Sequence, residues 1–361
     1  MQLSHFIYRD KKDQPFLLYY LAKLLSAIYG ACVNLRNTLY ERGVLPSHRL
    51  PGTCISVGNL VVGGTGKSPV VGEVIQMLLE AGAKPAVLSR GYGFHLAKGD
   101  SLLLLNTQVI RRRCSKFALR EGSPDEARML SSRFPDVPIL VGRDRLKTAQ
   151  WYLEQKEEAP PTHWILDDGF QHRRIVRDFN ILLLDAKKPL GNGELLPLGP
   201  LREGLASIKR ADFVLFTRCN PSFPSPYWQE AVRNFGKEFS RVEFLSHIGK
   251  DISQSIDFSS VHHPSLLVCG LAHPERLAKD LEEKGVPLHA VSFEPDHGAF
   301  DRQKILSLSK GCASILTSEK DYWRNPKVFE ELPIPIFFIK LSIILSSDLQ
   351  TKIVSFARLT P

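Results

Sequence analysis

The chain has 361 residues, of which 43% are hydrophobic and 24% charged, and its formal net charge is +9. These proportions are typical of a folded globular protein and exclude a collagen-like, low-complexity or wholly disordered chain. The positive charge favours an anionic partner, which could be nucleic acid, an acidic membrane surface or a phosphorylated small molecule.

The first predicted element is an apolar helix over residues 16–37. Its less apolar positions recur every three or four residues and form one narrow stripe: Lys23, Ser26, Gly30, Asn34 and Asn37. A lysine inside hydrocarbon costs roughly 3 kcal/mol, so we expect an amphipathic helix that lies in the membrane interface with this stripe facing water. Basic residues flank it, as on helices that rest on anionic lipid. The alternative is a helix docked on the core of the protein.

From residue 53 onward, short apolar runs alternate with helical patterns, which predicts an α/β fold with mainly parallel strands. The predicted strands are 53–57, 85–89, 138–142, 163–167, 180–185, 213–217, 264–270 and 312–317. A stretch rich in glycine and proline predicts a boundary near residues 200–212. We therefore expect an N-terminal helix region over 1–45, a core domain over 46–210 and a second, smaller α/β domain over 211–361.

A glycine-rich loop, GGTGKS, lies between the strand at 53–57 and a helical pattern. This is the context of a phosphate-binding loop, because glycines let backbone N–H groups turn toward phosphates and the helix N-terminus adds its positive end. Lys67 would contact the β- and γ-phosphates, and Ser68 would ligate Mg²⁺. The common pattern starts with a glycine, where this chain has Val61. The expected binding residues are Gly63, Gly64, Thr65, Gly66, Lys67 and Ser68.

The strand at 163–167 ends in a pair of carboxylates, Asp167 and Asp168. A carboxylate at the C-terminal end of a strand, in a chain that also has a phosphate loop, typically helps to hold Mg²⁺. The pair is therefore a candidate part of the metal site.

A second acidic candidate lies in the stretch GSPDEA. Its pattern predicts a helix start with Ser123 as N-cap, Pro124 at the first helical position and Glu126 as the capping-box partner. Asp125, between them, is either the general base for a hydroxyl group or only an acid that stabilises the helix dipole. The sequence leaves both interpretations open.

Taken in order, these stretches resemble the tetraacyldisaccharide 4'-kinase family of lipid A biosynthesis. The resemblance runs over nearly the whole chain, through SVGNLVVGGTGKSP, LSRGYG, ILDDGFQHRR, LLDA, GNGELLPLGPLRE, PDH and TSEKD. DDGFQH and LLPLGPLRE are not general signatures of nucleotide hydrolases, so the combination is more specific than the loop alone. In this family the loop begins VGN, and Val61 is its normal form.

The resemblance implies phosphorylation, dependent on ATP and Mg²⁺, of the 4'-hydroxyl of an acylated disaccharide 1-phosphate at the cytoplasmic face of the inner membrane. It also implies a P-loop kinase core, a second domain that closes over the nucleotide, and an N-terminal helix that touches the anionic bilayer. Where the family usually has GDEP, this chain has GSPDEA, so Asp167 or Asp168 could act as base in place of Asp125. Carried over by motif, the expected metal ligands are Ser68, Asp167 and Glu203, and the expected catalytic residues are Asp125, Asp168 and His297.

Three other functions are less consistent with the sequence. A regulatory GTPase or ATPase at the membrane shares the fold class, but a GTPase needs an Asn-Lys-x-Asp motif, and the nearest stretch, SEKD, lacks the asparagine. A non-enzymatic membrane scaffold would explain the basic amphipathic helix but not the presence of Lys67, Ser68 and Asp167. The basic run RRRC at 111–114 has no interleaved aromatic residues, so we expect no nucleic-acid partner.

Overall fold

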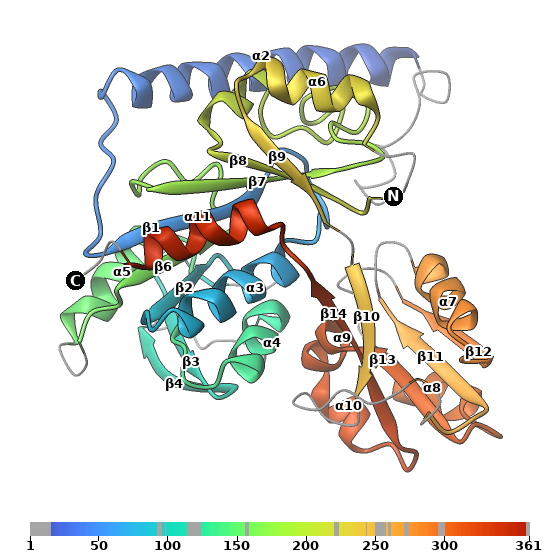
Figure 1. The fold of residues 1–361 in the computed structure, drawn as a ribbon. Helices are drawn as coiled ribbons and strands as arrows, with labels where there is room; N and C mark the ends of the chain where they lie inside the picture. Colours follow the sequence, from blue (N-terminus) through green and yellow to red (C-terminus); the bar gives the residue numbers. More distant parts are fainter. Residues whose placement is uncertain are drawn as a thin grey trace. The chain divides into compact units, whose positions relative to one another are not determined.

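The computed structural model shows a mixed α/β protein with a long N-terminal helix (Figure 1). Its contacts divide the chain into two compact units. Unit 1 comprises Met1–Leu88, Ala149–Phe244 and Ile343–Pro361, and unit 2 comprises Ser89–Thr148 and Leu245–Ser342. The structure describes residues 16–91, 96–97, 99–113, 124–155, 159–219, 224–242, 244–249, 258, 261–270, 274–294 and 300–358.

Unit 1 carries the long helix and most of the parallel strands. Its elements, some of which end a few residues beyond the unit, are α2 (Phe16–Glu41), β1 (Thr53–Asn59), α3 (Lys67–Glu80), β2 (Pro85–Ser89), α5 (Arg145–Glu154), β6 (His163–Asp167), β7 (Phe179–Asp185), the 3₁₀ helix η2 (Leu205–Arg210), β8 (Phe213–Thr217), α6 (Pro226–Asn234), β9 (Glu238–Arg241) and α11 (Ser347–Arg358).

The larger sheet has nine strands in the order β4-β3-β5-β2-β6-β1-β7-β8-β9. From β2 to β9 every neighbouring pair is parallel. Except for the edge strand β9, these strands are nearly continuous runs of buried residues, as expected for parallel strands covered on both faces. Because they are parallel, the loops that follow β1, β6, β7 and β8 leave the same edge of the sheet, where α/β proteins bind ligands.

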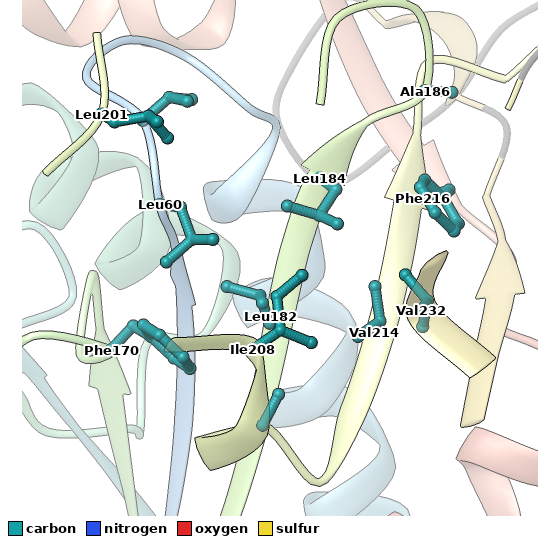
Figure 2. Close-up of a cluster of buried hydrophobic side chains, with 12 residues drawn as sticks. Leu60, Phe170, Leu182, Leu184, Ala186, Leu201, Ile208, Val214, Phe216 and Val232 are labelled. Atoms are coloured by element: carbon teal, nitrogen blue, oxygen red, sulfur yellow. The ribbon is translucent and has the colours of Figure 1, made fainter. Parts of the chain in front are cut away.

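A hydrophobic cluster covers β7 and β8 in unit 1 (Figure 2). Ile208 of η2 and Val232 of α6 pack against the strands. Each large side chain that is buried in this way contributes roughly 1.5–3 kcal/mol. The buried members are Leu60, Val61, Phe170, Leu182, Leu184, Ala186, Leu201, Ile208, Ala211, Val214, Phe216 and Val232. The cluster therefore fixes the chain just before the phosphate loop, at Leu60 and Val61, and the segment around Leu201.

Unit 2 contains a smaller sheet of five strands in the order β10-β14-β13-β11-β12, whose β12, β11, β13 and β14 are parallel. Unit 2 also contains β3, β4 and β5, in which β3 is antiparallel to β4 and to β5. Its elements are β3 (Ser101–Leu105), β4 (Gln108–Arg113), α4 (Asp125–Arg133), β5 (Ile139–Gly142), β10 (Phe244–Gly249), β11 (Ser265–Cys269), α7 (Pro274–Glu283), β12 (Leu288–Phe293), α8 (Arg302–Leu308), β13 (Ser314–Ser318), α9 (Glu319–Arg324), α10 (Pro326–Glu330) and β14 (Ile336–Ile343).

The predicted α/β class is confirmed, and each of the eight predicted runs contains a strand. The hairpin of β3 and β4 was not predicted from the sequence. Its turn residues, Asn106 and Thr107, have φ angles of 45° and 64°. A two-residue turn of this kind favours Asn-Gly, and threonine in the second position hides the signal. The compact units also differ from the predicted consecutive ranges, because residues 89–148 group with 245–342.

Helix α2 docks on unit 1 with the stripe that we expected to face water. Ser26 is buried, and its Oγ donates to the carbonyl oxygen of Leu195 at 2.9 Å. A Cβ on Gly30 would lie 2.8 Å from Leu195 Cδ1, so the glycine permits a close approach. The prediction that the whole stripe faces water is wrong, although Lys23 and Asn34 are exposed.

The opposite face of α2 is apolar and exposed. Within the described residues, Leu17–Glu41 is the one helix long and apolar enough to cross a membrane by length and composition. Side chains of this face include Leu17, Leu21, Leu24, Leu25, Ile28 and Leu35. The helix is therefore amphipathic, but Ser26 and Gly30 of the polar stripe lie against the protein while the leucine-rich face is exposed.

Candidate active site

The phosphate loop joins β1 to α3, and its glycines have the backbone conformation that the turn requires. Gly63 and Gly66 have φ angles of 108° and 81°, a region that residues with a Cβ rarely adopt. Gly66 is the N-cap of α3 and Lys67 is the first residue of the helix, so Ser68 lies in the first turn. The loop thus presents the helix N-terminus and the Lys67 side chain as a phosphate site needs.

The loop is held at two further points. Thr65 is buried, and its Oγ1 accepts from Asn59 Nδ2 at 2.9 Å. Arg218, which follows β8, donates from Nη2 to the carbonyl oxygen of Gly64 at 2.6 Å and from Nη1 to Asp185 Oδ2 at 2.9 Å. These contacts fix the loop before any nucleotide binds, which reduces the entropy cost of ordering it.

Val61, which stands at the place of the usual first glycine, has a packing role. It forms an antiparallel bridge with Leu201, and the Val62 N–H donates to the carbonyl oxygen of Pro200 at 2.8 Å. Its side chain belongs to the hydrophobic cluster that contains Leu201. The entry to the loop is therefore a short paired segment, and a glycine there would lose this packing.

Asp168 lies beside Lys67, as the sequence predicts for residues of one site. Lys67 Nζ is 3.6 Å from Asp168 Oδ1. Arg202 Nη1 donates to both carboxylate oxygens of Asp168, at 2.9 and 2.8 Å. Asp168 has a φ angle of 51°, a sparsely populated region for a residue other than glycine, and such strain persists at functional sites. Arg202 had no predicted role of its own, since the sequence does not show that its side chain meets Asp168.

The glycine after this aspartate is required by its surroundings. The Gly169 N–H donates to the carbonyl oxygen of Val57 at 3.0 Å. A Cβ on Gly169 would lie 2.5 Å from both Leu166 Cβ and Ser56 Oγ. These distances are shorter than real Cβ contacts, so any larger residue must displace the Asp167-Asp168 turn.

We expect Gly169→Ala to cost about 1–3 kcal/mol of stability, as overpacking does, and to lower ATP turnover at least tenfold because the carboxylates move. Circular dichroism and a turnover assay measure the two effects. The matched control is Gly204→Ala, since Gly204 has a φ angle of −68° and no atom within 4 Å of its Cβ position. Equal activity in both variants would contradict the role of Gly169.

Asp167 and Ser68 carry oxygen atoms of the kinds that a magnesium ion prefers as ligands. Asp167 is the last residue of β6 and pairs in register with Val57 of the neighbouring β1. Carboxylate and hydroxyl oxygens are ligands that Mg²⁺ prefers, and Mg²⁺ is usually bound by one or two carboxylates plus phosphates and water. The described part of the chain has no group of three or more His, Cys, Asp or Glu side chains able to hold a metal.

Glu203 lies elsewhere, under helix α2, and is fully buried with an exposure of 0%. Its Oε1 accepts from Arg36 at 3.0 Å, and its Oε2 accepts from Asn37 at 3.1 Å and from Ser207 at 2.9 Å. Arg210 also donates to Oε2. Both oxygens are thus occupied by protein donors, so the contacts do not support the predicted metal ligation, and we do not retain Glu203 as a ligand.

Asp125 lies in unit 2 and is the first residue of α4. The N-cap is Pro124, so the helix begins one residue later than predicted, and Ser123 lies outside the described residues. Asp125 Oδ1 accepts from the Glu126 N–H at 2.9 Å, and Oδ2 is 3.6 Å from Arg324 Nε. The carboxylate therefore lies at the helix N-terminus and beside a guanidinium group, both of which interact favourably with a negative charge.

The guanidinium group beside Asp125 is itself held by a buried acid. Arg324 Nη2 lies 3.1 Å from Asp321 Oδ1, and Asp321 Oδ2 accepts from the Gly270 N–H and from Ser318 Oγ. Burial raises the pKa of the Asp321 carboxyl above its ordinary value, and these donors lower it in part. The stretch TSEKD thus supports Asp125 indirectly. His297, the other predicted catalytic residue, lies outside the described residues.

Comparison with known proteins agrees with the resemblance. The family model described as tetraacyldisaccharide-1-P 4'-kinase matches residues 18–358. A tetraacyldisaccharide 4'-kinase of Pelobacter propionicus is 34% identical over 89% of this chain and 87% of its own length. One of Syntrophus aciditrophicus is 33% identical over 92% of this chain and 91% of its own.

A solved structure is also similar over almost the whole chain. It is a crystal structure described as an "apo" form of LpxK from Aquifex aeolicus in complex with ATP. It has a TM-score of 0.72 and 27% sequence identity, and the match covers 95% of this chain and 100% of that one. A match of this extent includes the sheet, the phosphate loop and the long helix together, so the chain belongs to the tetraacyldisaccharide 4'-kinase family and is a lipid A 4'-kinase.

Proposed function

We propose that the phosphate loop of this chain binds ATP and that the chain transfers the γ-phosphoryl group to the 4'-hydroxyl of a tetraacylated glucosamine disaccharide 1-phosphate. The observation that carries the proposal is the contact of Lys67 with Asp168, at the edge of the sheet where the loop leaves β1. The similar protein of known structure was solved with ATP, which supports the choice of nucleotide.

The loop, Lys67 and Asp168 divide the work of phosphoryl transfer. Backbone N–H groups of residues 63–68 and the N-terminus of α3 bind the phosphate oxygens, and Lys67 reaches the β- and γ-phosphates. Asp168, held by Arg202, keeps Lys67 directed toward them. Such a site works chiefly by positioning and by stabilising charge that develops on the transferred group.

We assign Ser68 and Asp167 to Mg²⁺, since one hydroxyl and one buried carboxylate leave room for phosphate oxygens. The ion, when bound, would neutralise charge on the β- and γ-phosphates. Asp125 is our candidate for the residue that accepts the proton of the 4'-hydroxyl, and His297 for a residue that assists it.

The apolar face of α2 supports binding at the surface of the inner membrane, where an acylated substrate resides. Its leucine and isoleucine side chains are exposed and form one contiguous apolar face. A face of this kind marks an interaction surface. An interfacial helix buries such a face at the boundary of headgroups and acyl chains, and exposed Lys23 and Arg42 would attract anionic lipid. We place the chain at the cytoplasmic face.

The direct test is ATP turnover with a purified lipid A disaccharide precursor, with the phosphorylated position identified by mass spectrometry. We expect phosphate on the 4'-oxygen and dependence on Mg²⁺. Competition by GTP for the nucleotide site should be weak. Efficient competition by GTP, without phosphorylation of the glycolipid, would favour a GTPase instead.

We expect Asp125→Ala and Asp125→Asn each to lower kcat about 10²-fold or more with little change in KM, because a base acts on the hydroxyl in the transition state. Asp125→Asn retains an oxygen that can accept from the Glu126 N–H, so it separates catalysis from helix capping. Steady-state kinetics and thermal unfolding measure the two roles. A lower melting temperature with unchanged kcat would show that Asp125 only stabilises α4.

A further inference from the structure

The segment 194–203, here called the bridging segment, lies between helix α2 and the entry to the phosphate loop in unit 1. On the loop side, the Arg202 N–H donates to the carbonyl oxygen of Leu60 at 2.7 Å. On the helix side, Tyr29 Oη donates to the carbonyl oxygen of Arg202 at 3.0 Å. The backbone N–H and C=O of Arg202 are therefore both held, the first by Leu60 just after β1 and the second by Tyr29 of α2.

The side chain of Arg202 contacts Asp168, which lies beside Lys67. Arg202 donates to both oxygens of Asp168, whose Oδ1 is the atom nearest to Lys67 Nζ. Both contacts come from the single nitrogen Nη1 and are charge-assisted hydrogen bonds, which are stronger than neutral ones. A shift of Arg202 would therefore move the donor that holds Asp168 beside Lys67.

The next residue, Glu203, connects this segment to the C-terminal half of α2. Glu203 is fully buried and accepts from Arg36 and Asn37 of the helix. Ser207 and Arg210 of η2 hold it from the other side. A buried carboxylate that loses a donor retains an unsatisfied charge, so this contact resists displacement far more than an exposed ion pair. Burial also raises the pKa of the Tyr29 hydroxyl, which keeps it a donor.

We propose that α2 is a positioning element of the phosphoryl-transfer site: through Tyr29, Arg36 and Asn37 it sets Arg202 and, by that residue, the Lys67–Asp168 pair. The inference rests on the proposed roles of Lys67 and Asp168. It assigns α2 a second task besides membrane contact, and it makes Tyr29, Arg36 and Asn37 positioning residues that touch neither ATP nor the acceptor. Displacement of a catalytic group by about 1 Å can cost about a hundredfold in rate, so modest loosening of α2 should be measurable.

The test compares two identical substitutions on one helix, in the full-length protein with substrate in detergent micelles. Asn37→Ala removes a donor to Glu203, whereas Asn34→Ala alters an exposed position three residues away. We expect Asn37→Ala to lower kcat about tenfold, with KM for ATP within twofold of wild type, and Asn34→Ala to leave both unchanged. Equal kcat values for the two variants would overturn the proposal.

A double-mutant cycle with Arg202→Ala separates positioning from a general loss of stability. If Asn37 acts through Arg202, then Asn37→Ala should have no further effect on kcat in the Arg202→Ala background, and independent effects that multiply would refute the route. Tyr29→Phe, which deletes one hydroxyl, should lower kcat about threefold with an unchanged melting curve, and an unchanged kcat would count against the proposal even if Asn37→Ala folds poorly. Wild-type activity in the Lys67→Ala variant would instead refute the proposed function. Failure of the positioning role of α2 and failure of the proposed function therefore give different results.

Discussion

Lys67→Ala should reduce kcat for lipid phosphorylation by about 10³-fold, which corresponds to about 4 kcal/mol of transition-state stabilisation. Lys67 is the first residue of α3, directly after the left-handed Gly66, so its ammonium group and the helix N-terminus act on the same phosphates. The negative charge shifts during transfer, and a fixed cation in a water-poor site stabilises it without reorganisation. Alanine removes this charge and also takes from Asp168 one cationic neighbour, while the contact with Arg202 stays.

The measurement is steady-state turnover with the disaccharide precursor, together with ATP binding by calorimetry. Lys84→Ala is the matched control, since Lys84 is an exposed lysine shortly after the same helix. We expect it to retain wild-type kinetics. Turnover of Lys67→Ala within a few-fold of wild type would show that the glycine-rich loop is not the site of phosphoryl transfer.

The fold class and the phosphate loop are readable from the sequence because both depend on local patterns. Buried parallel strands need continuous apolar runs, and a left-handed N-cap needs glycine, as at Gly66. The carboxylates Asp167 and Asp168 follow from the same logic, since a strand end places them at the edge of the sheet. Nothing beyond neighbouring residues is required for these predictions.

The role of Glu203 could not be read in this way. Its donors on α2 lie 167 and 166 residues earlier in the chain, so no local spacing connects them. In the family motif LLPLGPLRE the glutamate is expected to be a metal ligand, and only its burial among four donors shows that it holds a helix. The role of Arg202 is hidden for the same reason, because its contact with Asp168 spans 34 residues.

The orientation of α2 was mispredicted because small polar residues suit two environments. Serine, glycine and asparagine are tolerated in water, but they also allow close packing and hydrogen bonds against another segment. Ser26 and Gly30 meet Leu195, which is 169 residues away from Ser26. Periodicity identifies a stripe on a helix, whereas the partner of the stripe depends on tertiary structure.

The exposed face of α2 leads to the second large effect. Leu17, Leu21, Leu24 and Ile28 follow at intervals of four, three and four residues and form one face, with exposures of 82, 51, 58 and 53%. Replacing all four with serine should reduce binding to anionic vesicles by about 10³-fold or more, because each buried leucine or isoleucine contributes roughly 1.5–3 kcal/mol. Binding of the unaltered protein should weaken as salt rises, since ions screen the attraction of Lys23 and Arg42 to anionic lipid.

Substitution tests this face more cleanly than deletion of the helix. Removing α2 would uncover the buried Glu203 and release Arg202, so activity would fall whether or not the helix binds lipid. The four substituted side chains make none of the described hydrogen bonds to the bridging segment, so kcat on detergent-solubilised substrate should stay within twofold of wild type. Vesicle co-sedimentation at two salt concentrations, with Asn34→Ala as a control on the same helix, measures the binding. A quadruple variant that folds, turns over the solubilised substrate and still binds vesicles as tightly as wild type would show that another surface contacts the membrane.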